Sequence, residues 1–346
     1  MKRPANAALI GLGMVADMHA QAIAGSQGRV QLRGVLSRRV EAAQQFQAKH
    51  DVPRAYVDLD ALLADDGLDF AIVATPPDAR TEFLGALAAR GLPVLCEKPL
   101  ERDLPRATAL VQTFDRAALP FGAVLQHRMR PAAITLKERI ARGELGDITT
   151  VEVRVPWWRD QSYYDAPGRG TYARDGGGVL ITQAIHTLDL MMDLVGDVAE
   201  VQAITASSRL HRLEAEDFAA AALRFASGAT GSLMASTTHF PGAAESITLN
   251  GTTASAALTA DSLTIYHRDG RVDSDGAAGG SGGGADPMAF SNDWHRAVIE
   301  DFARAVLTGR PPAIPARSAL RVHALIDAMA ASARKGLRIQ PEAPHD

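Results

Sequence analysis

The chain begins with an apolar segment that runs into a glycine loop and then into a helical pattern, ALIGLGMVADMHAQAI. Gly11, Gly13 and Ala16 fit the pattern G-x-G-x-x-A. The first glycine permits a tight turn, the second lets the backbone approach a pyrophosphate, and the small third residue lets helix and strand pack closely. Free N–H groups at the helix start then face the anion. We therefore predict that a dinucleotide binds here, beside Met14 and Val15.

From residue 1 to about residue 122, short apolar runs alternate with helical segments. The expected strands cover 6–13, 30–37, 70–75 and 93–99, and the expected helices cover 14–26, 39–50 and 79–91. Strands that are apolar on both faces are typical of a parallel sheet with helices on either side. The pattern predicts an α/β domain over residues 1–122.

After residue 122 the pattern changes to strands that alternate apolar and polar residues, as in DITTVEVRV at 147–155. Further strands are expected within 198–208, 217–239, 245–258 and 262–268, and helices over 177–195, 291–308 and 316–335. We predict an α+β domain over 123–346 with a large, mostly antiparallel open sheet. Its last helices could pack back on the first domain. The glycine-rich segment 276–287 is expected to be a surface loop, or alternatively a lid.

The charge and cysteine content exclude several classes of protein. A formal net charge of −4 over 346 residues gives no reason to expect a nucleic-acid or membrane-surface partner. One cysteine, Cys96, supports neither a disulfide framework nor a thiol cluster for zinc, and no metal site is predicted. Glycines interrupt the apolar N-terminal segment, and no apolar run reaches the length of a membrane span. We expect a soluble, cytoplasmic protein.

The end of the second expected strand bears on the choice of dinucleotide. Enzymes that favour NAD usually place an acidic residue there for the ribose 2′-hydroxyl. This chain has Ser37, Arg38 and Arg39, and its first acidic residue is Glu41. An arginine can instead pair with the 2′-phosphate of NADP. The alternative is two solvated arginines that open a helix, and NAD remains possible, but we favour NADP.

Three further stretches complete a recognisable pattern: ATPPDARTEF, CEKPL at 96–100, and GGGVLITQAIHTLDL. In register with the glycine loop, they make the chain resemble the Gfo/Idh/MocA family of NAD(P)-dependent sugar and cyclitol oxidoreductases. The resemblance runs from about residue 5 to the final helices. It implies an N-terminal Rossmann domain with a doubly wound parallel sheet, and a C-terminal domain whose open sheet often forms a subunit interface. A homo-oligomer, either dimer or tetramer, would follow.

The same resemblance implies that Lys98 is catalytic and that His186 is its partner. Oxidation of a secondary alcohol needs a base for the hydroxyl proton, and both side chains can exchange a proton. An exposed turn lysine and a helix-surface histidine are the structural alternatives. Many family members have an acidic residue four positions before the histidine, where this chain has Thr182, so Lys98 and His186 would do the acid–base work.

Other candidate residues follow from position and type. We predict contacts with the cofactor from Thr75, Pro76, Glu97 and Gln126, besides Lys98 and the residues already named. We predict contacts with substrate from Arg128, Tyr163, Arg169, Thr182, Gln183 and His186. Tyr163 and Arg169 come from an aromatic- and arginine-rich stretch suited to a sugar ring or an acidic group. Asp189 and Asp193 share the helix face of Thr182 and His186, and we expect them to lie in solvent.

The leading hypothesis is an NAD(P)-dependent oxidoreductase that transfers hydride between the nicotinamide and a secondary alcohol or ketone of a sugar, sugar derivative or cyclitol. One alternative is a reductase of a non-sugar substrate such as a dihydrodiol. Another is a non-catalytic sensor that binds NAD(P) and regulates a partner.

Overall fold

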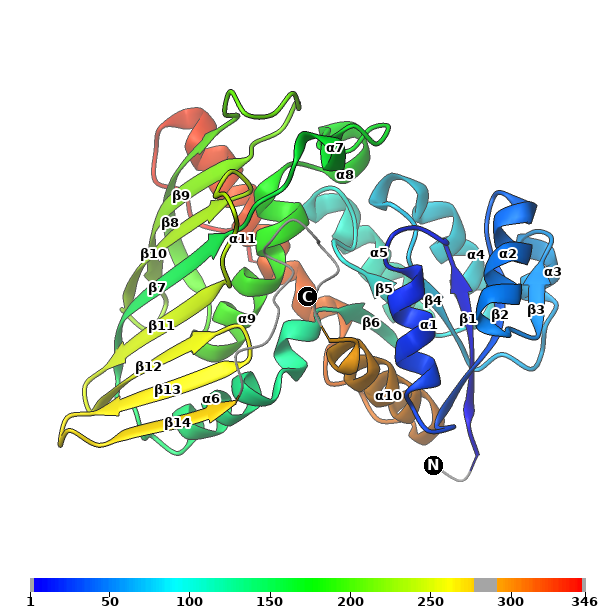
Figure 1. Ribbon diagram of the computed structural model, residues 1–346, viewed down its shortest axis with the longest axis horizontal. Coiled ribbons are helices and arrows are strands. Elements are labelled where there is room, and N and C mark those ends of the chain that lie inside the picture. The colour runs from blue at the N-terminus through cyan, green and yellow to red at the C-terminus, as the bar shows by residue number, and fades with distance from the viewer. Residues whose placement is uncertain (1–2, 277–290, 344–346) are drawn as a thin grey trace. The chain divides into compact units, whose positions relative to one another are not determined.

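The computed structural model describes residues 3–276 and 291–343 (Figure 1). The chain forms two compact units. The first unit comprises Met1–Gln126 and Asn292–Leu320, and the second comprises His127–Ser291 and Arg321–Asp346. The first unit therefore takes one late segment from the part of the chain expected to form the second domain. Apart from Gly276, the glycine-rich loop expected at 276–287 lies outside the described residues.

The first unit is built on a six-stranded parallel sheet with the order β3-β2-β1-β4-β5-β6. Its strands are β1 (Ala5–Ile10), β2 (Val30–Leu36), β3 (Arg54–Tyr56), β4 (Phe70–Val73), β5 (Val94–Glu97) and β6 (Phe121–Val124). This order confirms the predicted doubly wound sheet. The direction of winding reverses between β1 and β4, and in such sheets ligands bind outside the carboxyl ends of the strands at that point.

Helices pack with these strands. They are α1 (Ala16–Ala24), α2 (Val40–His50), α3 (Leu59–Leu63), the 3₁₀ turn η1 (Pro77–Ala79), α4 (Thr81–Arg90), α5 (Leu104–Arg116) and α10 (Asp293–Thr308). All of them except α10, which comes from the late segment of the chain, lie between two of the strands in the sequence. Figure 1 shows α10 running beside α1, which it contacts. The sequence did not indicate β3 or α3, because a three-residue strand and a five-residue helix are too short to show a hydrophobic period.

The second unit contains an eight-stranded sheet with the order β14-β13-β12-β11-β7-β10-β9-β8. Its strands are β7 (Ile148–Pro156), β8 (Val198–Ala206), β9 (Phe218–Phe225), β10 (Thr230–Ser236), β11 (Ser246–Gly251), β12 (Ala254–Thr259), β13 (Ser262–His267) and β14 (Val272–Gly276). Neighbouring strands are antiparallel except β7 and β10, which are parallel. The mostly antiparallel sheet is therefore confirmed. The sequence did not indicate β14, whose residues are polar and exposed.

Helices of the second unit cover one face of this sheet. They are α6 (Pro131–Ala141), α7 (Gln161–Tyr164), α8 (Tyr172–Asp175), the π-helical turn η3 (Leu180–Ala184), α9 (Ile185–Val195) and α11 (Ala316–Lys335), the last of which starts in the first unit. α9 packs on β7 and β11, and α6 packs beside it on β12 and β13. Arg154, Ile204 and Tyr266 on the opposite face are exposed.

The segment Tyr172–Val195 corrects the expectation that no apolar run reaches the length of a membrane span. Among the described residues, it is long and apolar enough to cross a membrane by length and composition, with a mean hydropathy of 1.3. However, 83% of the apolar 18-residue window within it is buried inside the protein, as in a core helix. The predicted helix over 177–195 also begins with a π turn, so its first turn contains an extra residue.

Candidate active site

The glycine loop after β1 has the form of a phosphate cradle. Gly11 has φ +95°, and a Cβ at this position would lie 2.7 Å from the backbone nitrogen of Thr75, so only glycine fits. A Cβ on Gly13 would meet nothing within 4 Å, which leaves open space beside the backbone. No side chain caps the start of α1. The N–H of Ala16 donates to the backbone oxygen of Gly13 at 3.1 Å, and the next N–H groups, those of Asp17 and Met18, face the loop and can bind an anion.

Two buried polar atoms at the same edge of the sheet also fit a bound cofactor. The Oγ1 atom of Thr75, just after β4, and the Oε1 atom of Gln126, after β6, form no hydrogen bond with the described residues. Buried polar atoms are normally satisfied, so each indicates a missing partner. Both residues were predicted from the sequence to contact the dinucleotide.

The end of β2 presents two cations. Arg38 and Arg39 are exposed, and neither forms an ion pair with a residue of the described ranges. The half-buried Ser37 accepts a hydrogen bond from the backbone N–H of Arg39 at 3.3 Å. Val40, the first residue of α2, follows directly. Arginines at this position have free donors for a 2′-phosphate.

Lys98 follows β5 and lies beside a buried charged cluster. Oε1 of Glu97 lies 2.9 Å from Nε2 of His19 on α1 and 3.9 Å from Nε2 of His295 on α10. Oε2 of Glu97 accepts the backbone N–H of Lys98 at 3.1 Å. All three side chains of the cluster are at least 94% buried, whereas Lys98 is half-buried. Neither His19 nor His295 was among the residues predicted from the sequence.

Burial and hydrogen bonding fix the charges in this cluster. Burial by itself would raise the pKa of Glu97. The hydrogen bond with His19 and the nearby positive charges outweigh burial, and together they lower the pKa to about 2. Because an ionised carboxylate only accepts, His19 donates through Nε2. Burial and the charge of His19 lower the pKa of His295 to about 3. Near pH 7 Glu97 is therefore an anion and His295 is neutral.

In the second unit, the three glycines before η3 accommodate Glu216. A Cβ on Gly178 would lie 1.8 Å from the backbone oxygen of Glu216, and Gly177 has φ +156°. The carboxylate of Glu216 accepts the backbone N–H groups of Gly178 and Leu180, both at 3.1 Å. These contacts show that the glycines admit the segment that caps the helix.

His186, on the first turn of α9, is 6% exposed and stacks on His127, with ring centroids 4.8 Å apart. Arg130 donates to Nε2 of His127 at 2.6 Å and pairs with Glu245 at 2.6 Å. A histidine that accepts from an arginine carries its proton on Nδ1 and is neutral. A neutral, anchored ring therefore supports one face of His186.

Asp189 does not lie in solvent, contrary to our expectation. It is 1% exposed and accepts two hydrogen bonds from the guanidinium of Arg128, one of them at 2.6 Å. Asp193 is half-buried and pairs with Lys137 at 2.8 Å and Arg128 at 3.5 Å. α9 is buried on nearly all sides, so its polar stripe meets Arg128 instead of water. This pairing favours a structural role for Arg128 over the predicted contact with substrate.

Four of the predicted substrate residues form a connected group. Nε2 of Gln183 donates to the hydroxyl of Tyr163 at 3.3 Å, and the guanidinium of Arg169 lies 4.3 Å from the centroid of the Tyr163 ring. The hydroxyl of Thr182 contacts the side-chain oxygen of Gln183 and lies 2.6 Å from the backbone oxygen of Gly178. Arg169 is half-exposed and forms no ion pair with a described residue. Gln183 is three residues before His186, the predicted acid–base residue.

Other aromatic residues of the same stretch are anchors. Trp157 donates to Glu245 at 3.1 Å, and the hydroxyls of Tyr164 and Thr237 lie 2.7 Å apart. Both aromatic side chains are buried.

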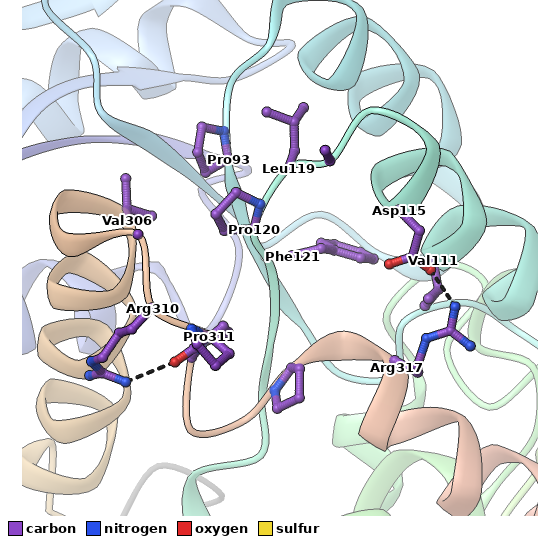
Figure 2. Close-up of a pocket in the computed structure, with 14 residues that line it drawn as sticks. Pro93, Val111, Asp115, Leu119, Pro120, Phe121, Val306, Arg310, Pro311 and Arg317 are labelled. Atoms are coloured by element: carbon purple, nitrogen blue, oxygen red, sulfur yellow. Dashed lines mark hydrogen bonds and ion pairs between the residues drawn. The ribbon is translucent and has the colours of Figure 1, made fainter. Parts of the chain in front are cut away.

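A pocket of about 590 Å³ in the first unit lies elsewhere (Figure 2). It is lined in part by Pro93, which precedes β5, and Pro120, which precedes β6. Asp115 and Arg317 in its wall pair with each other at 2.7 Å. The amino ends of the strands therefore form this pocket, whereas the cofactor loops follow the carboxyl ends, and we exclude it from the site.

Comparisons with known proteins agree with this geometry. Residues 5–123 match the model of an oxidoreductase family with an NAD-binding Rossmann fold, and residues 133–257 match the Gfo/Idh/MocA C-terminal domain. The glycine cradle, the doubly wound sheet and these matches define an NAD(P)-dependent oxidoreductase. The chain belongs to the Gfo/Idh/MocA family, as the resemblance implied.

Three relatives illustrate the range of the family. D-apiose dehydrogenase from Paraburkholderia graminis is 27% identical over 96% of this chain and 88% of its own. D-xylose 1-dehydrogenase (NADP(+)) 2 from Haloferax volcanii is 28% identical over 84% and 85%. The WlbA dehydrogenase from Bordetella pertussis, in complex with NADH and UDP-GlcNAcA, is 29% identical, with a TM-score of 0.84 over 99% and 100%.

Proposed function

We propose that this protein transfers hydride between NADP(H) and a secondary hydroxyl, or the matching ketone, of a sugar or sugar derivative. The observation that carries the proposal is the edge of the parallel sheet, where Gly13, Thr75 and Lys98 follow the carboxyl ends of β1, β4 and β5. When bound, the nicotinamide ring supplies the hydride acceptor or donor. The remaining chemistry is acid–base and falls to the protein.

Lys98 and His186 are the proposed acid–base residues. As hydride leaves the carbon, a base must take the hydroxyl proton, and in reduction an acid must return it. The fixed carboxylate of Glu97 holds the backbone at Lys98, and the neutral ring of His127 holds one face of His186. Both candidate groups are thus held by buried neighbours, Glu97 and His127.

The proposed preference for NADP rests on Arg38 and Arg39. Their exposed guanidiniums lie beyond β2 with no carboxylate pairing them in the described ranges. We expect the double substitution Arg38→Ser and Arg39→Ser to weaken NADPH binding by ~10-fold or more, since a hydrogen bond to a charged group contributes ~1.5–3 kcal/mol. NADH binding should change less than ~3-fold. The affinities are measured by fluorescence titration. An equal loss of affinity for NADPH and NADH would show that Arg38 and Arg39 do not select NADP.

A carboxylated sugar is the proposed substrate class. Arg169 is the observation that favours it, because its guanidinium is oriented over Tyr163 and keeps donors for an anion. The WlbA relative was solved with an acidic nucleotide sugar. Arg174 is a matched control, since it already pairs with Asp175 at 3.1 Å. Arg169→Gln should raise KM for uronates by ~10-fold and leave KM for neutral sugars unchanged. Arg174→Gln should leave both KM values unchanged.

The decisive experiment measures nicotinamide reduction across sugars, uronates, anhydrosugars, cyclitols and dihydrodiols, with NADP and with NAD. General acid–base catalysis contributes ~10²- to 10⁴-fold, so Lys98→Met should lower kcat by that amount. Lys137→Met, which removes an exposed lysine paired with Asp193, should leave kcat unchanged. Dinucleotide binding without turnover of any compound, or of the matching ketones, would favour the sensor instead.

Two further proposals come from the sequence and the family. Cytoplasmic location rests on composition, and a homo-oligomer rests on the resemblance together with the exposed face of the eight-stranded sheet. Sedimentation velocity of the purified protein tests the second.

A further inference from the structure

Arg80 is a buried cation that joins two loops of the first unit. It lies between the turn η1 and helix α4, and it is 2% exposed. Nε and Nη2 donate to the backbone oxygen of Thr75 at 2.8 and 2.7 Å. Nη1 donates to the backbone oxygens of Glu97 and Pro99. One guanidinium therefore holds the loop after β4 and the loop after β5.

The partners of Arg80 are unusual for a buried charge. No carboxylate in the described part of the chain forms an ion pair with it, and its hydrogen bonds go to three backbone carbonyls. Burying a charge without a counter-ion is unfavourable, so the three carbonyl dipoles must compensate for the lost water. A planar guanidinium can donate in two directions within its plane, whereas an ammonium cannot span the same carbonyls.

The loop after β5 is held from two sides around Lys98. Arg80 fixes the carbonyl groups of Glu97 and Pro99, and the carboxylate of Glu97 accepts the N–H of Lys98. His19 holds that carboxylate in turn. The backbone direction at Lys98 is thus set by buried charged groups on both sides.

We propose that Arg80 is a positioning residue that places Lys98 and the Thr75 turn in one arrangement, so that dinucleotide and acid–base residue are aligned by the same side chain. This inference rests on the proposed function for the role of Lys98. The role at Thr75 depends only on dinucleotide binding.

The test compares Arg80→Lys and Arg80→Gln with Arg90→Lys. Arg90 lies at the other end of α4 and also donates to a backbone carbonyl, that of Leu63 at 2.8 Å, so it controls for loss of an arginine on this helix. NADPH affinity and binding stoichiometry are measured by nicotinamide fluorescence. Values of kcat are then divided by the fraction of molecules that bind NADPH, so that misfolded protein is not counted.

We expect kcat per binding site to fall at least 10-fold in both Arg80 variants, with KM for the sugar unchanged, because Arg80 is buried and its donors are bound to backbone carbonyls. The dissociation constant for NADPH should rise at least 5-fold. Arg90→Lys should keep all values within 2-fold. A normal kcat per site in Arg80→Lys, at whatever melting temperature, would overturn the inference.

The outcomes separate this inference from the proposed function. If the wild type turns over no substrate, the function fails, and NADPH affinity alone decides the role of Arg80 at the Thr75 turn. An affinity lost in Arg80→Lys and kept in Arg90→Lys would then support that role. An affinity kept in both would refute it.

Discussion

The substitution Glu97→Gln tests the charged cluster behind Lys98 through its dependence on pH. Glutamine has nearly the shape of a protonated glutamate, so the variant behaves as a protein in which Glu97 never ionises. The pKa of Glu97 is lowered from 4.5 to about 2 on folding. A depressed carboxylate pKa stabilises the folded state above the unfolded value, and this stabilisation is lost as pH falls from about 4.5 to about 2.

The magnitude follows from the size of the shift. Each pKa unit corresponds to ~1.36 kcal/mol, so the ionised form of Glu97 contributes about 3 kcal/mol at pH 7. By the same relation about 2 kcal/mol remains at pH 3.5. For a domain of this size, ~3 kcal/mol corresponds to a Tm difference of roughly 6–12 °C.

Urea unfolding of wild type and Glu97→Gln at pH 7, 5 and 3.5 measures this difference. The control is Glu138→Gln, since Glu138 is 64% exposed and lies 3.9 Å from Arg142. That variant should stay within ~0.5 kcal/mol of wild type at each pH. A difference for Glu97→Gln that does not shrink between pH 7 and pH 3.5 would refute the assignment of an ionised, buried Glu97.

Two further predictions concern the second unit and its helix α9. Gly178→Ala should lower the free energy of unfolding by ~1–3 kcal/mol, because its Cβ would lie 1.8 Å from the oxygen of Glu216. The control is Gly85→Ala in α4 of the first unit, where a Cβ would meet nothing within 4 Å, and this substitution should raise the free energy of unfolding by ~0.5–1 kcal/mol. If thermal unfolding showed that both substitutions stabilise or both destabilise the protein, the collision with Glu216 would not explain the effect at Gly178. Arg128→Ala should destabilise the protein by ~3–5 kcal/mol, because it leaves the carboxylate of Asp189 buried and unpaired. Lys137→Ala, which removes only an exposed contact with Asp193, should lower the free energy of unfolding by less than ~1 kcal/mol. If Arg128→Ala and Lys137→Ala destabilised the protein equally, Arg128 and Asp189 would not form a buried ion pair.

The sequence predicted the parallel sheet and the glycine cradle because both have local signals. The strand β1, Gly11 and helix α1 are consecutive, and each has the residue types that its conformation requires. The strands β7 to β13 show a period of two, since one face of their sheet is buried and the other is exposed.

The charged cluster could not be predicted in this way. His19 and Glu97 are 78 residues apart, and His295 comes from a helix late in the chain. No period or spacing connects them, because the sheet order brings them together. The same holds for Arg80, which looks like an ordinary residue at a helix start until its three carbonyl partners are seen.

Asp189 shows a different limit. Its spacing places Asp189 on the helix face of His186, and from the polar residues of that face we predicted that Asp189 is exposed to solvent. The helix is surrounded by protein, and Arg128 supplies the partner from 61 residues away. A pattern of polar residues indicates a polar environment, and the environment can be another side chain.

The contact between Gly178 and Glu216 limits how this enzyme can be altered for new substrates. A mutagenesis library that randomised the segment before η3 would consist largely of inactive clones, since a side chain at position 178 collides with the backbone of Glu216. Diversity is better directed to Tyr163, Arg169 and Thr182, where side chains are only half-buried. The glycine and its partner segment would have to be transplanted together into any chimaera with another family member.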